Sequence, residues 1–406
     1  MLNQLPIIVA VKIVFAHLNF QPLSSMIAIN SKLPNVGASI FPVMTGLANE
    51  YKAVNLAQGF PDFPTSPKLI SLVNDYMKKG MNQYAPPPGI LPLRERIAEM
   101  TFNLTGKSYS PDKEVTITAG GTQAIYSVIE ALVREGDEVI IFEPAYDCYA
   151  PNIRVHGGIP RPVELTPPDY KIDWENVKKL ISHKTRMIML NTPHNPTGTI
   201  LSKKDIDELI KITKNTDILI LSDEVYEHII FDGQTHHSMA KYPVLAERSL
   251  IVSSFGKTFH TTGWRMGYLL GPDYLMAEIR KLQQYAVYTC ITPIQYAIAD
   301  FMASPEHYME VKSMYQEKRD YFAGLMRNTR FDLLPVAGSY FQTAHYNKIS
   351  EEGDYDFAIR ITKEFGVATI PTSVFYTSNA DHKVIRFCFA KTEDTLHRAV
   401  DRLMKI

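Results

Sequence analysis

A single lysine follows a short apolar run and a turn of small residues, and it could supply an amine for covalent chemistry. Lys257 lies in the string SSFGKTF at residues 253–259, and Arg265 follows eight positions later. A buried lysine amine beside cationic and phosphate-binding groups has a lowered pKa and forms Schiff bases readily. A lysine in a serine–glycine loop is more often a solvated surface group, so the neighbouring motifs must decide between the two interpretations.

A glycine pair and an acidic residue each follow a predicted strand. The string TAGGTQ at residues 118–123 joins a strand to a helix, where free N–H groups favour an anion such as phosphate. It lacks the Lys-Ser/Thr ending of a P-loop, and a plain tight turn is the alternative. Asp223 follows the apolar run at residues 217–221, so its carboxylate could pair with a protonated ring nitrogen or simply cap a helix. Tyr226 lies on the same face if a helical turn follows.

The string NTPHNPTG at residues 191–198 is the most specific of these motifs. Its prolines favour an extended, rigid turn at a strand end, which would hold the amide of Asn195 in one orientation. The alternative is an ordinary proline-rich loop.

The elements that must position these residues alternate along the chain. Short, nearly continuous apolar runs predict strands at residues 114–118, 138–142, 186–190, 217–221 and 250–253, with helices at 123–133 and 203–213. Ser202 is the expected N-cap of the second helix. This alternation predicts an α/β fold with a mainly parallel sheet, whose ligand site lies beyond the carboxyl ends of the strands.

A second, smaller α+β unit is expected towards the carboxyl terminus. It contains predicted helices at residues 305–328 and 354–365 and strands at 338–341 and 384–389. We expect residues 66–302 to form the large domain, 303–406 the small domain, and 26–65 an irregular arm that packs on the small domain.

The composition is that of an ordinary globular protein. The chain has 406 residues, 45% hydrophobic and 21% charged residues, and a formal net charge of -1, which argues against nucleic-acid binding. Cys148, Cys290 and Cys388 show no metal-ligand spacing, so we predict no metal and a reduced, cytoplasmic setting.

The first 25 residues are treated separately. They are apolar but lack a basic n-region, Lys12 interrupts the run, and the run is too short to span a membrane. Because Met26 starts an ordinary amino terminus, we expect residues 1–25 to be an extension outside the core, with an interfacial anchor or export signal as the alternative.

Together these strings resemble a known family. Over residues 30–406 the chain is similar to fold-type I pyridoxal-phosphate aminotransferases of the class I/II group. The resemblance rests on four strings in the family's order and spacing, namely HNPTG (194–198), SDEVY (222–226), SSFGKTF (253–259) and GWR (263–265). It implies pyridoxal 5'-phosphate as cofactor and a seven-stranded, mainly parallel sheet flanked by helices, plus a smaller α+β domain.

The resemblance also implies roles for individual residues. Lys257 would bind the cofactor as a Schiff base and then act as the catalytic base, Asp223 would pair with the pyridine nitrogen, and Asn195 and Tyr226 would bond the 3-oxygen. The implied phosphate and ring contacts are Gly121, Thr122, Ser254, Arg265, Tyr146 and, from the neighbouring subunit, Tyr84. The implied substrate contacts are Arg386, which clamps the α-carboxylate, and Gly59, Asn195, Phe60 and Tyr288.

The substrate is expected to be a large neutral L-amino acid. Dicarboxylate-selective relatives supply a second Arg across the dimer, but residues 283–300 hold neither Arg nor Lys and offer Tyr285, Tyr288 and Ile291. The strings at residues 144–149 and 191–195 resemble the methionine, aromatic, kynurenine and glutamine branch. We therefore predict a homodimer that transfers the amino group of such a substrate to a 2-oxo acid.

Three alternatives remain at this point. A cysteine-conjugate β-lyase and an aspartate or broad-specificity aminotransferase would share the same motifs. A non-catalytic effector-sensing regulator would need a basic DNA-binding extension, whereas residues 1–25 hold one Lys and no Arg.

Overall fold

A computed structural model of the chain describes residues 30–34 and 36–406. The predicted extension at residues 1–25 lies outside the described residues. The chain divides into two compact units, Met1–Val36 and Gly37–Ile406, and the account below concerns the second. No helix in the described ranges is long and apolar enough to cross a membrane.

The larger sheet has seven strands, in the spatial order β2-β8-β7-β6-β5-β3-β4. Its strands are β2 (Val115–Thr118), β3 (Glu138–Glu143), β4 (Ile159–Glu164), β5 (Thr185–Asn191), β6 (Leu219–Asp223), β7 (Ser249–Ser254) and β8 (Gly267–Leu270). Strand β8 is antiparallel to β2 and β7, and the other neighbouring pairs are parallel. The predicted fold class, a mainly parallel seven-stranded sheet, is confirmed.

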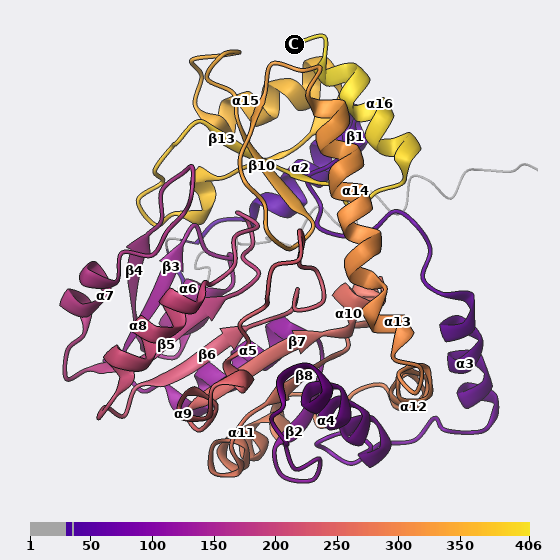
Figure 1. Cartoon of the computed structure of the whole chain (residues 1–406), viewed down its shortest axis with the longest axis vertical. Coiled ribbons are helices and arrows are strands. Elements are labelled where there is room, and N and C mark those ends of the chain that lie inside the picture. Colours follow the sequence, from indigo (N-terminus) through magenta and orange to yellow (C-terminus); the bar gives the residue numbers. More distant parts are fainter. Residues whose placement is uncertain (1–29, 35) are drawn as a thin grey trace, which may run out of the picture. The chain divides into compact units, whose positions relative to one another are not determined.

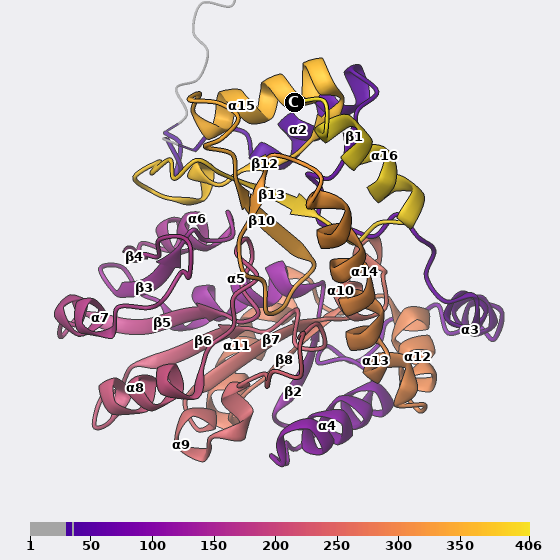
Figure 2. The ribbon, with the colours of Figure 1, turned by 45° about the horizontal axis from the view of Figure 1, so that its top comes forward.

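Both faces of this sheet are buried, because successive strand residues enter two different apolar cores. In β3, for example, Ile140 belongs to one core and Ile141 to the other. One face is covered by α4 (Leu91–Thr105), α7 (Trp174–Leu180), α8 (Lys203–Thr213), α9 (Pro243–Ala246) and α12 (Thr292–Phe301). The other face is covered by α5 (Gly121–Leu132), α6 (Tyr149–Val155) and α11 (Asp273–Ala286). Figure 2 shows α6 and α8 on opposite sides of the strands.

Two-sided burial explains why the strands could be predicted as continuous apolar runs. The predicted N-cap of α8 is also present, since Ser202 and Asp205 form a capping box.

The smaller sheet is antiparallel and has the order β12-β13-β10-β9. Its strands are β9 (Asp332–Leu333), β10 (Phe341–His345), β12 (Ile370–Pro371) and β13 (Val384–Cys388). Around it lie α14 (Val311–Met326), α15 (Asp354–Arg360) and α16 (Glu393–Leu403). By contrast, α13 (Glu306–Met309) contributes Tyr308 to a core of the larger sheet, and α3 (Pro67–Lys78) packs against α12. The predicted helix at residues 305–328 is thus two helices, and the strand predicted at 338–341 begins only at Phe341, because Ser339 has a left-handed φ of 63°.

The segment before residue 65 is not irregular as predicted. It forms helix α2 (Ile40–Glu50) and strand β1 (Val54–Asn55), and β1 pairs in parallel with β11 (Val367–Ala368). Ile40, Met44 and Ala48 are buried at a spacing of four residues, which gives α2 an apolar face against Ile370. Figure 1 shows α2 and β1, in indigo and purple, among the orange and yellow elements of the smaller sheet. The domain boundaries at residues 65 and 302 stay a prediction.

Candidate active site

One cavity of about 360 Å³ lies where β5, β6 and β7 end, between these strand ends and β13. Most of the residues singled out in the sequence line it, from segments far apart in the chain. They are Gly59, Gly121, Thr122, Tyr146, Asn195, Asp223, Tyr226, Ser254, Lys257, Arg265 and Arg386.

Five of the residues named for the site or its pocket do not line this cavity in the single chain, and two of them, Tyr285 and Ile291, are 86% and 52% exposed. Phe60, Tyr84 and Tyr288 are 42%, 82% and 46% exposed, respectively. Tyr84 and Tyr288 contact each other edge to face, with ring centroids 5.2 Å apart. The ring of Phe60 instead lies 4.6 Å from the amine of Lys391. The roles proposed for these three residues stay predictions.

Lys257 lies in the short helix α10 (Phe255–Thr258), directly after β7. Its Nζ donates to the hydroxyl of Tyr340 at 2.8 Å and to the carbonyl oxygen of Gly59 at 3.4 Å. Burial lowers the pKa of Lys257 to about 8. About a tenth of this amine is therefore uncharged at pH 7, and this fraction can act as a base or a nucleophile.

Asp223 is the last residue of β6 and is 4% exposed. Its Oδ2 accepts from the hydroxyl of Tyr149 at 2.5 Å, and its Oδ1 accepts from the N–H of Val225 at 3.3 Å. Burial raises the pKa of Asp223 to about 6, and these two hydrogen bonds oppose the rise. A buried carboxylate of this kind favours a cationic partner in the cavity.

The raised pKa predicts a pH-dependent effect of Asp223→Asn on stability in the chain without bound ligand. Between pH 4 and 6 the folded wild type holds a proton that the unfolded chain releases, so its stability falls as the pH rises. The asparagine variant does not lose stability in this way, because asparagine has no proton to release in this pH range. Its free energy of unfolding relative to wild type should therefore rise by on the order of 2 kcal/mol from pH 4 to pH 7.

Denaturant unfolding of both proteins at pH 4, 5, 6, 7 and 8 measures this difference in the free energy of unfolding. Groups that titrate equally in both proteins do not contribute to the difference. A difference that does not change with pH would show that burial does not raise the pKa of Asp223.

A cradle for an anion lies at the amino terminus of α5. Gly120 has a φ of 81°, and a Cβ there would lie 2.6 Å from Nη2 of Arg265, so only glycine lets the guanidinium approach this turn. Gly121 and Thr122 open the twelve-residue helix α5, and Ser254 faces the same cavity. Helix N–H groups, a hydroxyl and an arginine are the donors that phosphate prefers.

Arg386 is a buried cation without a carboxylate partner in the described ranges. It is 0% exposed, its Nη1 donates to Oδ1 of Asn195 at 2.7 Å, and its Nη2 donates to the carbonyl oxygen of Ala57 at 2.8 Å. Its Nε has no hydrogen-bond partner among the described residues, and its Cζ lies 3.9 Å from the ring centroid of Phe341. Because an unpaired buried charge is costly, this arrangement suits an anion that enters the cavity.

Sequence reasoning did not assign roles to several residues that shape the cavity. They are Phe41, Gln58, Tyr149, Asn191 and Phe341, and also Tyr340, which contacts Lys257. Asn191 was detectable, because it opens the rigid string at residues 191–198. Its Oδ1 accepts from the N–H of Asn195 at 2.8 Å and its Nδ2 donates to the carbonyl oxygen of Asp223 at 2.9 Å.

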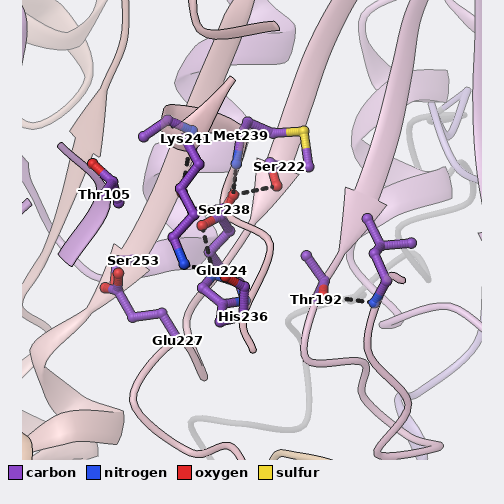
Figure 3. Close-up of polar contacts among 12 residues, drawn as sticks. Thr105, Thr192, Ser222, Glu224, Glu227, His236, Ser238, Met239, Lys241 and Ser253 are labelled. Carbon is purple, nitrogen blue, oxygen red and sulfur yellow. Dashed lines mark hydrogen bonds and ion pairs between the residues drawn. The ribbon is translucent and has the colours of Figure 1, made fainter. Parts of the chain in front are cut away.

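A buried polar network fixes the turn that carries Asp223. Glu224 is 0% exposed and accepts hydrogen bonds from the hydroxyl of Ser222, the N–H of Met239 and the ring of His236, at 2.8, 3.0 and 2.8 Å. Figure 3 shows these side chains converging on Glu224. Since its neighbour Asp223 shares this backbone, the network holds the cavity wall in place.

An α/β fold that gathers a lysine amine, a buried carboxylate, an anion cradle and an unpaired arginine at its strand ends defines an enzyme that handles anionic substrates through an amine. The profile of the family described as "Aminotransferase class I and II" matches residues 51–403. The chain belongs to this family and is an aminotransferase, which confirms the resemblance seen in the sequence.

Individual relatives agree with this assignment. The chain is 45% identical to the methionine aminotransferase of Escherichia coli (strain K12), over 93% of this chain and 98% of that protein. It is 32% identical to human kynurenine–oxoglutarate transaminase 1, over 88% and 93%. A crystal structure of an Escherichia coli methionine aminotransferase superposes with a TM-score of 0.92 at 44% identity and covers 94% of this chain and 100% of that one.

Proposed function

We propose that this aminotransferase uses pyridoxal 5'-phosphate and moves the amino group of a large neutral L-amino acid to a 2-oxo acid. The observation that carries the proposal is the convergence of Lys257, Asp223 and Arg386 on one cavity. These residues supply an amine, an anion for a cationic ring and a cation for a carboxylate.

The donor set of the cavity fits this cofactor. The cradle of Gly121, Thr122, Ser254 and Arg265 would hold the phosphate group. Asp223 would face the ring nitrogen, and Tyr146 would stack on the ring, a contact worth about 0.5–1.5 kcal/mol. Two further polar side chains in the cavity wall, Asn195 and Tyr226, would bond the 3-oxygen.

In the proposed reaction the cofactor, when bound, supplies an electron-accepting ring and a carbon that carries the amino group between substrates. Lys257 removes the proton from the α-carbon of the amino acid, because its lowered pKa leaves it able to accept a proton near neutral pH. Asp223 would stabilise positive charge at the ring nitrogen of the bound cofactor. Arg386 orients the substrate by its carboxylate and thereby presents the α-carbon to Lys257.

The preference for a neutral side chain rests on the charges of the cavity. Its cationic lining residues, in the part of the chain that the structure describes, are Lys257, Arg265 and Arg386, and each already has a role. Residues 283–300 add no Arg or Lys, so nothing in this segment would pair with a second carboxylate. Phe41, Tyr146 and Phe341 give the wall an aromatic character. The similarity to enzymes named for methionine and kynurenine supports the same preference.

The proposal includes a homodimer in which Tyr84 and Tyr288 reach the site of the neighbouring subunit. Both side chains are exposed in the single chain although they are large and aromatic. Exposed aromatic groups that contact each other are typical of an interaction surface.

A panel of amino donors tests the substrate class. With pyruvate, 2-oxoglutarate or 4-methylthio-2-oxobutanoate as acceptor, we expect kcat/KM for methionine, phenylalanine or kynurenine to exceed that for aspartate by about 100-fold or more, since an unpaired buried carboxylate costs several kcal/mol. Initial rates over the panel provide the measurement. A preference for aspartate over methionine would refute the neutral pocket and favour the dicarboxylate alternative.

A further inference from the structure

The hydroxyl of Tyr340 lies between the amine of Lys257 and the backbone of the loop at residues 58–60. It donates to the carbonyl oxygen of Gly59 and accepts from Nζ of Lys257 at 2.8 Å. Gly59 cannot be replaced without moving this loop, because a Cβ there would lie 2.6 Å from Cζ of Phe341. The three groups therefore have a fixed arrangement.

Tyr340 itself is rigidly held. It is 0% exposed, and its ring packs edge to face against Tyr226, with centroids 5.1 Å apart. The ring of Tyr315 is tilted against it, with centroids 5.6 Å apart. The carbonyl oxygens on either side of Gly59 are also bound, because the buried Lys391 donates to Phe60 at 2.7 Å and to Gln58 at 3.5 Å. Neither partner of the Lys257 amine can move freely.

The direction of these hydrogen bonds leaves two oxygens as acceptors for the amine of Lys257. Burial raises the pKa of Tyr340 well above its ordinary value, so the phenol keeps its proton and donates a hydrogen bond to the carbonyl oxygen of Gly59. The phenol oxygen then accepts one N–H of Lys257, and the Gly59 oxygen accepts the second. When the amine has lost its extra proton, these two oxygens engage both of its N–H bonds, so its lone pair is free for reaction.

The charged side chains around Lys257 do not bind its amine directly. Burial has the largest effect on its pKa, Asp223 favours its protonated form, and Arg265 and Arg386 oppose that form. Lys257 forms no ion pair within 4 Å in the described ranges, and its direct partners are Tyr340 and Gly59.

We propose that Tyr340 is a positioning residue for Lys257: its hydroxyl orients the free amine, so that the lone pair of the deprotonated amine is available for reaction, whenever the amine is not bonded to the cofactor. This inference rests on the proposed function. Tyr340, which precedes β10 of the smaller sheet, would thus position a lysine that follows β7 of the larger sheet.

The test compares three full-length proteins prepared without cofactor, namely wild type, Tyr340→Phe and Tyr315→Phe. Tyr315 is the matched control, since it is also 0% exposed in the same aromatic cluster but its hydroxyl lies 3.2 Å from Nδ1 of His260. Two quantities are measured. The first is the affinity for pyridoxamine 5'-phosphate, which has no aldehyde and cannot bond to Lys257. The second is the rate at which Lys257 captures pyridoxal 5'-phosphate, followed by absorbance and located by borohydride reduction and peptide mass spectrometry.

In the capture, the amine nitrogen bonds to the aldehyde carbon, and its two protons leave with the aldehyde oxygen as water. We expect Tyr340→Phe to slow capture about tenfold, the scale of one well-placed hydrogen bond, with unchanged pyridoxamine 5'-phosphate affinity. Tyr315→Phe should change neither quantity.

Capture by Tyr340→Phe at the wild-type rate would overturn the inference, as would an equal loss in Tyr315→Phe or a parallel loss of pyridoxamine 5'-phosphate affinity. If the wild type itself failed to capture pyridoxal 5'-phosphate at Lys257, the proposed function would fail, and the inference with it.

Discussion

Replacement of Lys257 by alanine is expected to reduce amino-group transfer by about 10⁴-fold or more. A positioned general base contributes up to about 10⁴ in rate, and this lysine is also the proposed covalent anchor of the cofactor. The variant should still bind pyridoxal 5'-phosphate through the cradle at α5, because Gly121, Thr122, Ser254 and Arg265 are untouched. Equilibrium dialysis and initial rates with methionine and a 2-oxo acid measure the two effects.

Lys257→Arg is the control for charge. It keeps a cation at residue 257 but supplies no amine that can lose a proton near neutral pH, so it should be as inactive as the alanine variant. Retained transamination in either variant would mean that another group carries the proton.

Replacement of Arg386 is expected to have the second largest effect, on substrate binding. The guanidinium is buried and bonded to Asn195 and Ala57, and its Nε has no partner among the described residues. Truncating one side of a buried charge pair costs roughly 2–5 kcal/mol, so Arg386→Gln should lower kcat/KM for methionine by about 10²-fold to 10³-fold. Steady-state kinetics provides the measurement.

Arg386→Lys separates the effect of charge from the effect of geometry. Lysine keeps the positive charge but lacks the planar guanidinium that donates two parallel hydrogen bonds to a carboxylate. A second control uses the decarboxylated amine of methionine, which lacks the α-carboxylate. The rate of amino-group transfer from this amine should be the same in wild type and Arg386→Gln, because the amine has no carboxylate for Arg386 to bind. An unchanged KM for methionine in Arg386→Gln would place the carboxylate clamp elsewhere.

Much of the larger sheet could be predicted because each of its central strands is buried on both faces. Strand β4 was not predicted, since Pro160 and Pro162 interrupt its pattern, and it lies at the edge of the sheet where proline is tolerated. Strand β8 was missed as well; it begins two residues after Arg265, which has a left-handed φ of 54°.

Residues of the cavity could be placed from the sequence where they end or closely follow a strand. Gly121, Asp223 and Ser254 belong to this group, because parallel strands bring their carboxyl ends together. Tyr340 and Tyr149 could not be found in this way. Tyr340 precedes an antiparallel strand of the smaller sheet, and Tyr149 opens a helix, so their contacts with Lys257 and Asp223 depend on packing between distant segments.

The most direct test of the central claim is a single half-reaction with methionine in the absence of any 2-oxo acid. The proposed aminotransferase should convert one methionine per active site to 4-methylthio-2-oxobutanoate, leave pyridoxamine 5'-phosphate on the protein, and then stop. Continued turnover with release of ammonia would contradict the account, because it would show that the site eliminates a substituent, as a β-lyase or related enzyme does, and returns the cofactor unchanged.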